Sequence, residues 1–169
     1  MKRERLVKRC ISGLTAFLIA ALTALPGSAA GEKPATAPSL YERLGGADNI
    51  AVVVDDIIET SYKNGVFHAN PRIAEGHKQF PKAAYKFKVT LLACQVTGGP
   101  YSYIGRTMKE AHQHLNISEA EWKELRAVIR GSLTKYNVPQ REQDELIAII
   151  ESTKGEIIAP AVKSATSIQ

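Results

Sequence analysis

The stretch TGGPYSYIGRTMKEAHQHLNI, residues 97–117, decides how the rest of the sequence is interpreted. Gly98, Gly99 and Pro100 predict the end of a preceding helix, because glycine accepts the left-handed conformation and proline cannot continue the helical hydrogen bonds. A second, short helix is predicted from about Arg106 to Leu115. This second helix carries His112.

His112 is placed on the apolar side of its helix. It follows Met108 by four residues and precedes Leu115 by three, so these three side chains share one face. His114, two positions further on, turns to the opposite side at ~100° per residue, and we expect it to face solvent. An isolated histidine on an apolar face is more often a packed core residue than a metal ligand, so the spacing alone leaves both interpretations open.

The remaining pattern predicts an all-α fold, because long strand-like alternation is absent. We expect a helix over about 48–62 with Val53, Ile57 and Ile58 on one stripe, and an irregular loop with one turn of helix over 65–82. Ser118 and Glu121 form a capping box that predicts the start of another helix. Pro139 suits the first turn of the last helix, whose predicted buried side consists of Leu146, Ile149, Ile150 and Ile157.

A helix over about 82–97 has apolar residues on more than one side. One stripe contains Ala84, Phe87, Leu91 and Cys94, and the other contains Tyr85, Val89, Leu92 and Val96. A helix that is apolar on two sides must bury both. We therefore expect one stripe to meet a neighbouring helix and the other to meet a further helix or a ligand.

The N-terminal residues 1–30 are typical of a signal peptide. A basic start, an apolar run of about 16 residues and the small residues 27–30 follow one another in the expected order. An uncleaved anchor helix is the alternative, but this run is short for a hydrocarbon layer of ~30 Å. The sequence predicts a flexible linker over 31–38, one domain over 39–160, a tail over 161–169, and a periplasmic or secreted protein without a membrane anchor after cleavage.

Composition excludes several classes of function. The chain has 169 residues with 44% hydrophobic and 23% charged residues, as in ordinary globular domains. Residues 1–30 hold five of the 22 basic residues and one of the 17 acidic ones. The mature part therefore has 17 basic and 16 acidic residues. The net charge of +5 therefore gives no reason to expect a nucleic-acid partner. Zinc sites are not indicated either, because one mature cysteine and four scattered histidines lack the clustering that zinc needs.

Four motifs in order resemble the truncated haemoglobin family. They are SLYERLGG at 39–46, VVDD at 53–56, NPRI at 70–73, and the run from Gly98 to His112 that contains GGP, a tyrosine, a glycine and Met108. The resemblance covers about residues 40–158. It implies a globin-like two-over-two helical sandwich, with haem held between the helix over 82–97 and the segment that carries His112.

The resemblance also assigns site residues. It implies that His112 is the proximal iron ligand and that Met108 contacts the haem just ahead of it. Tyr85 and Val89 are expected to face the pocket by helical spacing, although core packing explains them equally well. The other predicted contacts are Lys88 at the rim, Tyr103 near the haem edge together with Arg106, and the lining residues Ile58 and Leu115.

On the distal side the sequence departs from the family. Many members have an aromatic pair ending in tyrosine after the VVDD-like motif, and that tyrosine donates a hydrogen bond to bound oxygen, whereas this chain has Ile57 and Ile58. Tyr85 could restore the donor. His77 or His68 could instead act as a sixth iron ligand, although each is more often simply a loop histidine.

Three functions follow from these expectations. The first is an exported haem protein that binds a diatomic gas, oxygen or nitric oxide, or that cycles the haem iron redox state with a redox partner. The second is a haem enzyme for nitric oxide or peroxide turnover. The third is a haem-free helical module that uses the same cavity for an apolar ligand.

Overall fold

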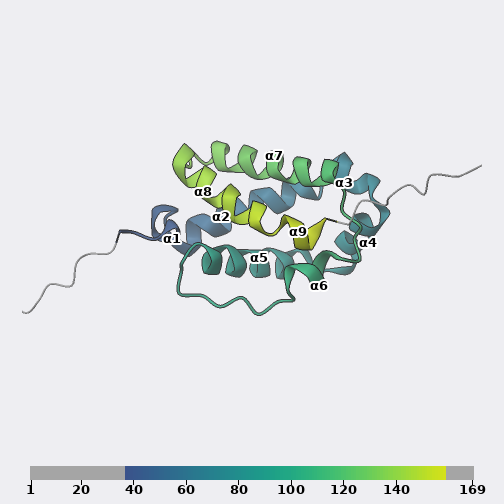
Figure 1. Ribbon diagram of the computed structural model, residues 1–169, viewed down its shortest axis with the longest axis horizontal. Helices are drawn as coiled ribbons and strands as arrows, with labels where there is room; N and C mark the ends of the chain where they lie inside the picture. Colours follow the sequence, from purple (N-terminus) through teal and green to yellow (C-terminus); the bar gives the residue numbers. More distant parts are fainter. Residues whose placement is uncertain (1–36, 159–169) are drawn as a thin grey trace, which may run out of the picture. The chain divides into compact units, whose positions relative to one another are not determined.

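The computed structural model describes residues 37–158. Residues 1–36 and 159–169, which hold the predicted signal peptide, most of the linker and the predicted tail, lie outside the described part. Within it every regular element is an α-helix, which confirms the all-α prediction there (Figure 1). The helices are α1 (Leu40–Arg43), α2 (Gly46–Ser61), α3 (Gly65–Ala69), α4 (Pro71–Gln79), α5 (Lys82–Val96), α6 (Met108–His112), α7 (Glu119–Lys135), α8 (Gln140–Ser152) and α9 (Lys154–Ile157).

Helix α2 packs against α5 on one side and against α7 on another. Its two sides belong to two separate apolar clusters. The first cluster contains Ile50, Val54 and Ile58 of α2 with Cys94 of α5. The second brings Val53 and Ile57 of α2 against Ile129 and Leu133 of α7 and Ile147 of α8. The prediction of one stripe holding Val53, Ile57 and Ile58 was wrong, because Ile57 and Ile58 point about 100° apart and serve different neighbours.

The segment between α2 and α5 is more helical than the sequence analysis predicted. Instead of a loop with one turn, it forms α3 and α4. Each of these helices begins with an asparagine whose side chain accepts hydrogen bonds from the first turn, Asn64 for α3 and Asn70 for α4. Pro71 occupies the first turn of α4, where its missing N–H is not needed. Because α4 buries no residue completely, apolar periodicity could not reveal it.

The turn after α5 requires the two glycines of the GGP motif, Gly98 and Gly99. Gly98 has a φ of +89°, a conformation that L side chains rarely adopt. A Cβ atom at Gly99 would lie 2.6 Å from the ring of Tyr41 and 2.8 Å from the carbonyl oxygen of Cys94. Glycine at both positions therefore allows the chain to leave α5 against α1.

The C-terminal helices surround a buried tryptophan. The predicted capping box is present, with Ser118 and Glu121 bonded reciprocally at the start of α7. Trp122 in the first turn is 2% exposed, and its indole nitrogen faces the carboxylate of Glu151. The last predicted helix is in fact two helices, because the helical structure is interrupted at Thr153, between α8 and α9. None of the helices in residues 37–158 combines the length and apolar character needed to cross a bilayer.

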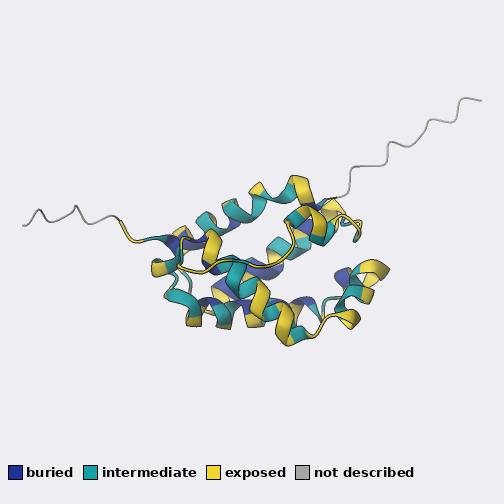
Figure 2. Cartoon of the chain, turned by 90° about the horizontal axis from the view of Figure 1, so that it is seen from below, coloured by how far each residue is buried: buried dark blue, intermediate teal, exposed yellow. Residues whose placement is uncertain are grey.

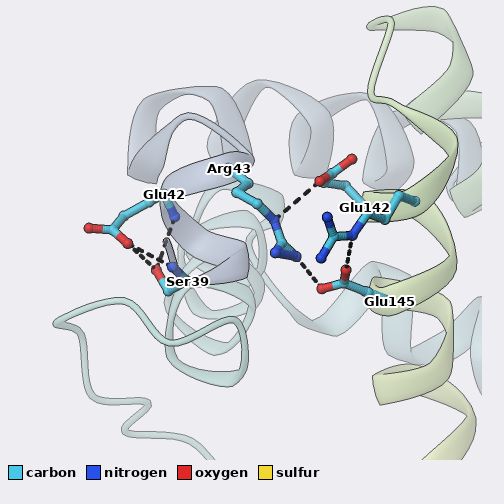
Figure 3. A network of polar contacts seen from close by, with 6 residues as sticks. Ser39, Glu42, Arg43, Glu142 and Glu145 are labelled. Carbon is cyan, nitrogen blue, oxygen red and sulfur yellow. Dashed lines mark hydrogen bonds and ion pairs between the residues drawn. The ribbon is translucent and has the colours of Figure 1, made fainter. Parts of the chain in front are cut away.

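A charged network joins α1 to α8 (Figure 3). Arg43 forms ion pairs with Glu142, at 3.1 Å, and with Glu145. Glu145 also accepts from Arg141 one turn earlier, at 3.0 Å. On the other side of α1, Ser39 and Glu42 form a capping box. These polar contacts fix the short α1, which is too short to be stable alone.

Candidate functional site

His112 lies at the C-terminal end of the five-residue helix α6. Thr107 and Glu110 form a capping box that starts this helix. The His112 side chain is half-buried, as are Met108 at the start of α6 and Leu115 just after it. His114 is exposed, as expected for the opposite side of the helix.

The imidazole of His112 is held by a backbone carbonyl. Its Nδ1 atom lies 2.7 Å from the carbonyl oxygen of Met108, one helical turn earlier. A carbonyl oxygen can only accept, so Nδ1 carries the proton and Nε2 keeps its lone pair. Burial lowers the pKa of His112, the bond to Met108 opposes this shift, and His114 adds a smaller lowering. A neutral imidazole with one nitrogen bonded and the other free is the form that binds a metal ion.

Helix α5 presents apolar side chains that the described protein does not cover. Of its 15 residues only Cys94 is fully buried. Tyr85, Phe87 and Val96 are 38%, 60% and 40% exposed. Tyr85 and Val96, eleven positions apart, share one face of α5, whereas Phe87 points to the other side. An exposed apolar face of this kind is typical of a surface that an apolar ligand covers.

Tyr85 lies among other phenols and is 38% exposed. Burial is the largest cause of its raised pKa, and the neighbouring phenols of Tyr62 and Tyr103 add to it. Tyr85 of α5 therefore lies near Tyr103 of the following connection and near Tyr62 at the end of α2.

Tyr62 is a site residue that the sequence analysis missed. It follows Ile58 by four residues, so a helical continuation places both on the same side of α2. Its ring stacks on the imidazole of His77, with centroids 3.9 Å apart and an angle of 12° between the planes. The ammonium of Lys82 lies 4.8 Å from its ring centroid. The spacing from Ile58 was the available signal, but it competed with the reading of Tyr62 as a helix end.

His77 lies on α4, half-buried against Tyr62. Its Nδ1 atom is buried and has no hydrogen-bond partner among residues 37–158. Burial lowers the pKa of His77, and the nearby His68 and Lys82 lower it further. The ring of His68 lies edge-on to the ring of His77, with centroids 5.8 Å apart. The role of either histidine as a sixth iron ligand stays a prediction.

The other predicted contacts are spread over α2, α5 and the loop after α5. Ile58, which is 4% exposed, and Val89 belong to the cluster between α2 and α5, whereas Lys88 is exposed. The connection over residues 98–107 is mostly exposed (Figure 2). Tyr103 lies in it, half-buried, and its side chain occupies the space beside Gly105. Arg106 is exposed in the same connection.

Two open surface hollows are lined by neither His112 nor Tyr85. One is bordered by α3, the start of α4 and the start of α7. The other lies between α2 and α7. Neither is lined by a histidine or a cysteine that could bind iron, whereas α6 carries His112. In the described part of the chain no group of three or more His, Cys, Asp or Glu residues is arranged to hold a metal ion.

Comparison with known proteins identifies the class. The family model of the bacterial-like globins matches residues 39–159, and the chain belongs to this family. The fold is similar to that of truncated haemoglobin from Tetrahymena pyriformis, with a TM-score of 0.62 and 21% identity over 73% of this chain and 100% of that one. It is also similar to the 2/2 haemoglobin of Synechococcus sp. PCC 7002, with a TM-score of 0.57 and 25% identity over 70% and 95% of the two chains. The all-α, two-over-two globin fold is thereby established, and haem is the cofactor.

The residues present fit this group. Haem needs one nitrogen ligand on a fixed element and an apolar surface on which the porphyrin can lie. The free Nε2 of His112 meets the first need, and the exposed Tyr85 and Val96, which share one face of α5, meet the second. The phenols of Tyr62 and Tyr103 add polar groups close to Tyr85.

Proposed function

We propose that this chain is an exported haem protein that binds oxygen or nitric oxide, with His112 as the proximal iron ligand. The observation that carries the proposal is the 2.7 Å contact from Nδ1 of His112 to the Met108 carbonyl oxygen. It fixes the tautomer and the ring orientation and directs the lone pair of Nε2 away from its own helix. Haem supplies the reversible gas binding, and the protein sets access and polarity around it.

Tyr85 is proposed as the distal hydrogen-bond donor. Ile58 stands where many relatives have a donor tyrosine, and it is buried in the apolar cluster with Cys94. The Tyr85 phenol is protonated at neutral pH, since a phenol ordinarily titrates at about pH 10 and burial raises the pKa of Tyr85 further. No hydrogen bond from another described residue contributes to that pKa, and its O–H is therefore proposed as the donor to a diatomic ligand.

Export is supported by the sequence pattern of residues 1–30. We propose cleavage after the small residues 27–30, which gives a periplasmic or secreted domain with a short linker. Expression of the full chain in a bacterial host followed by N-terminal sequencing of the periplasmic fraction tests this point. A protein that keeps residue 1 and stays with the membrane pellet contradicts it.

The experiment for the cofactor ligand compares two histidines two positions apart. The purified protein is titrated with haem, and the absorption spectrum is recorded in the ferric, ferrous and carbon monoxide forms. We expect His112→Ala to abolish stable haem binding and His114→Ala to leave it nearly unchanged, because His114 is exposed. Equal loss in both variants contradicts the assignment.

A further inference from the structure

Helix α6 cannot hold His112 in place by itself. It has five residues and none of them is fully buried. Isolated helices shorter than ~12 residues are marginal in water, because nucleation is costly. The capping box at Thr107 and Glu110 fixes the beginning of α6. The end of α6, where His112 lies, needs contacts from elsewhere.

Two side chains at the start of α4 supply such contacts. Nη1 of Arg72 donates to the carbonyl oxygen of His114 at 2.9 Å. Nδ2 of Asn70 donates to the carbonyl oxygen of Leu115 at 3.0 Å. These carbonyls lie two and three residues after His112, where the helix has ended and the chain offers its acceptors no regular partners. Both contacts join segments more than 40 residues apart in sequence.

Asn70 forms hydrogen bonds through both the oxygen and the nitrogen of its side-chain amide. Its Oδ1 accepts from the backbone N–H groups of Arg72, at 3.0 Å, and Ile73, at 3.4 Å, and so caps α4. Its Nδ2 is thereby directed to Leu115. Serine would also cap the helix but is too short to reach Leu115. Aspartate would cap it without donating, and would bring a second carboxylate beside Glu121, with which the Asn70 side chain also interacts.

We propose that Asn70 and Arg72 are positioning residues for the proximal histidine. They form a strap from the first turn of α4 to the chain just after His112, and this strap fixes the orientation in which the imidazole meets the iron. The inference rests on the proposed function, because it assumes that His112 is the ligand. It adds residues that reach His112 only through the backbone just after it.

The test uses the haem-loaded protein with Asn70→Ser and Arg72→Leu. Arg72 is exposed, so its replacement does not threaten folding. The iron–histidine stretching vibration is measured by resonance Raman spectroscopy directly after photolysis of the ferrous carbon monoxide complex. We expect both variants to shift and broaden this band, and to release haem about fivefold faster, the factor expected for one lost hydrogen bond. Arg72→Lys, which keeps a donor, is expected to restore the band towards that of the wild type.

Asn64 provides a matched control. Its Oδ1 accepts from Val66 N at 2.9 Å and caps α3, while its Nδ2 donates to Glu124 of α7 at 2.7 Å. Asn64→Ser therefore removes the same kind of contact away from His112. We expect it to lower the unfolding temperature without moving the iron–histidine band. A band that moves equally in Asn64→Ser and Asn70→Ser overturns the strap and shows a general loss of rigidity.

The outcomes separate this inference from the proposed function. An unchanged band and haem release rate in Asn70→Ser and Arg72→Leu, together with loss of haem in His112→Ala, overturn the strap alone. Retention of an unchanged iron–histidine band in His112→Ala overturns the assignment of the ligand, and the strap with it. A shifted band that Arg72→Lys restores supports both.

Discussion

Tyr62 and His77 stack face to face, with ring centroids 3.9 Å apart. The contact joins the end of α2 to α4, a helix that buries no residue completely. We expect His77→Ala to loosen α4, because an aromatic pair contributes about 0.5–1.5 kcal/mol beyond the area that it buries. Amide hydrogen exchange over residues 71–79 measures this. His77→Phe keeps the stacking and should exchange at the wild-type rate, whereas equally fast exchange in both variants contradicts the role of the stack.

Tyr85→Phe tests the distal donor. Removing the hydroxyl takes away one hydrogen bond to the gas, and we expect oxygen to leave the ferrous protein about tenfold faster, the factor that corresponds to about 1.4 kcal/mol. Stopped-flow displacement of oxygen by carbon monoxide gives the rate. Tyr136→Phe is the control, because Tyr136 is exposed at the end of α7. Identical rates in wild type and Tyr85→Phe show that Tyr85 is not the donor.

Arg43→Ala tests the network between α1 and α8 that Figure 3 displays. The change leaves the carboxylate of Glu142, a residue 8% exposed, without its cation. We expect the free energy of unfolding to fall by about 1–3 kcal/mol, the usual cost of an unsatisfied buried polar group. Urea denaturation measures the loss. Arg141→Ala removes only an exposed pair with Glu145, and an equal loss there would mean that burial of Glu142 does not matter.

Asp56 predicts a pH dependence of stability. Hydrogen bonds from Lys135 and, to a smaller extent, Ser132 hold its pKa below the ordinary value. The unfolded chain therefore binds a proton before the folded one as pH falls, so the stabilisation is complete above about pH 4 and is lost below it, towards the lower pKa of the folded state.

The test of Asp56 is a series of urea denaturations of wild type and Asp56→Asn between neutral pH and about pH 3. We expect the wild type to be more stable at neutral pH and the difference to shrink in the acid range. Ser132 donates to Asp56 at 2.8 Å, and Ser132→Ala should reproduce part of the effect. A difference that stays constant across the whole range contradicts the prediction.

Sequence reasoning predicted the structure correctly where neighbouring residues alone determine the local conformation. Gly98 and Gly99 end α5 because positive φ and close approach to Tyr41 leave no room for another residue. The Ser118 and Glu121 box starts α7 because both partners lie within one turn. The face of His112 followed from its spacing to Met108 in the same way, and the carbonyl of Met108 then proved to be its partner.

It failed where tertiary contacts decide. Helix α4 is fixed by the side chain of Asn70 and by the Tyr62 and His77 stack, and neither leaves an apolar period in the sequence. The division of α2 between two clusters depends on which neighbour each side meets, and single-sequence patterns do not contain that information. The stacking of Tyr62 on His77 could not be predicted for the same reason, since His77 lies 15 positions further along the chain.

The central claim is that the Nε2 atom of His112 binds the haem iron. The most direct measurement is resonance Raman spectroscopy of ferrous His112→Gly protein with and without added imidazole. We predict that without imidazole the variant neither holds haem stably nor shows the iron–histidine band. Imidazole that fills the space left by the side chain should restore haem binding together with an iron–imidazole band, and this band should shift when the imidazole is isotopically labelled. A wild-type band in His112→Gly without imidazole would contradict the account, because another residue would then hold the iron.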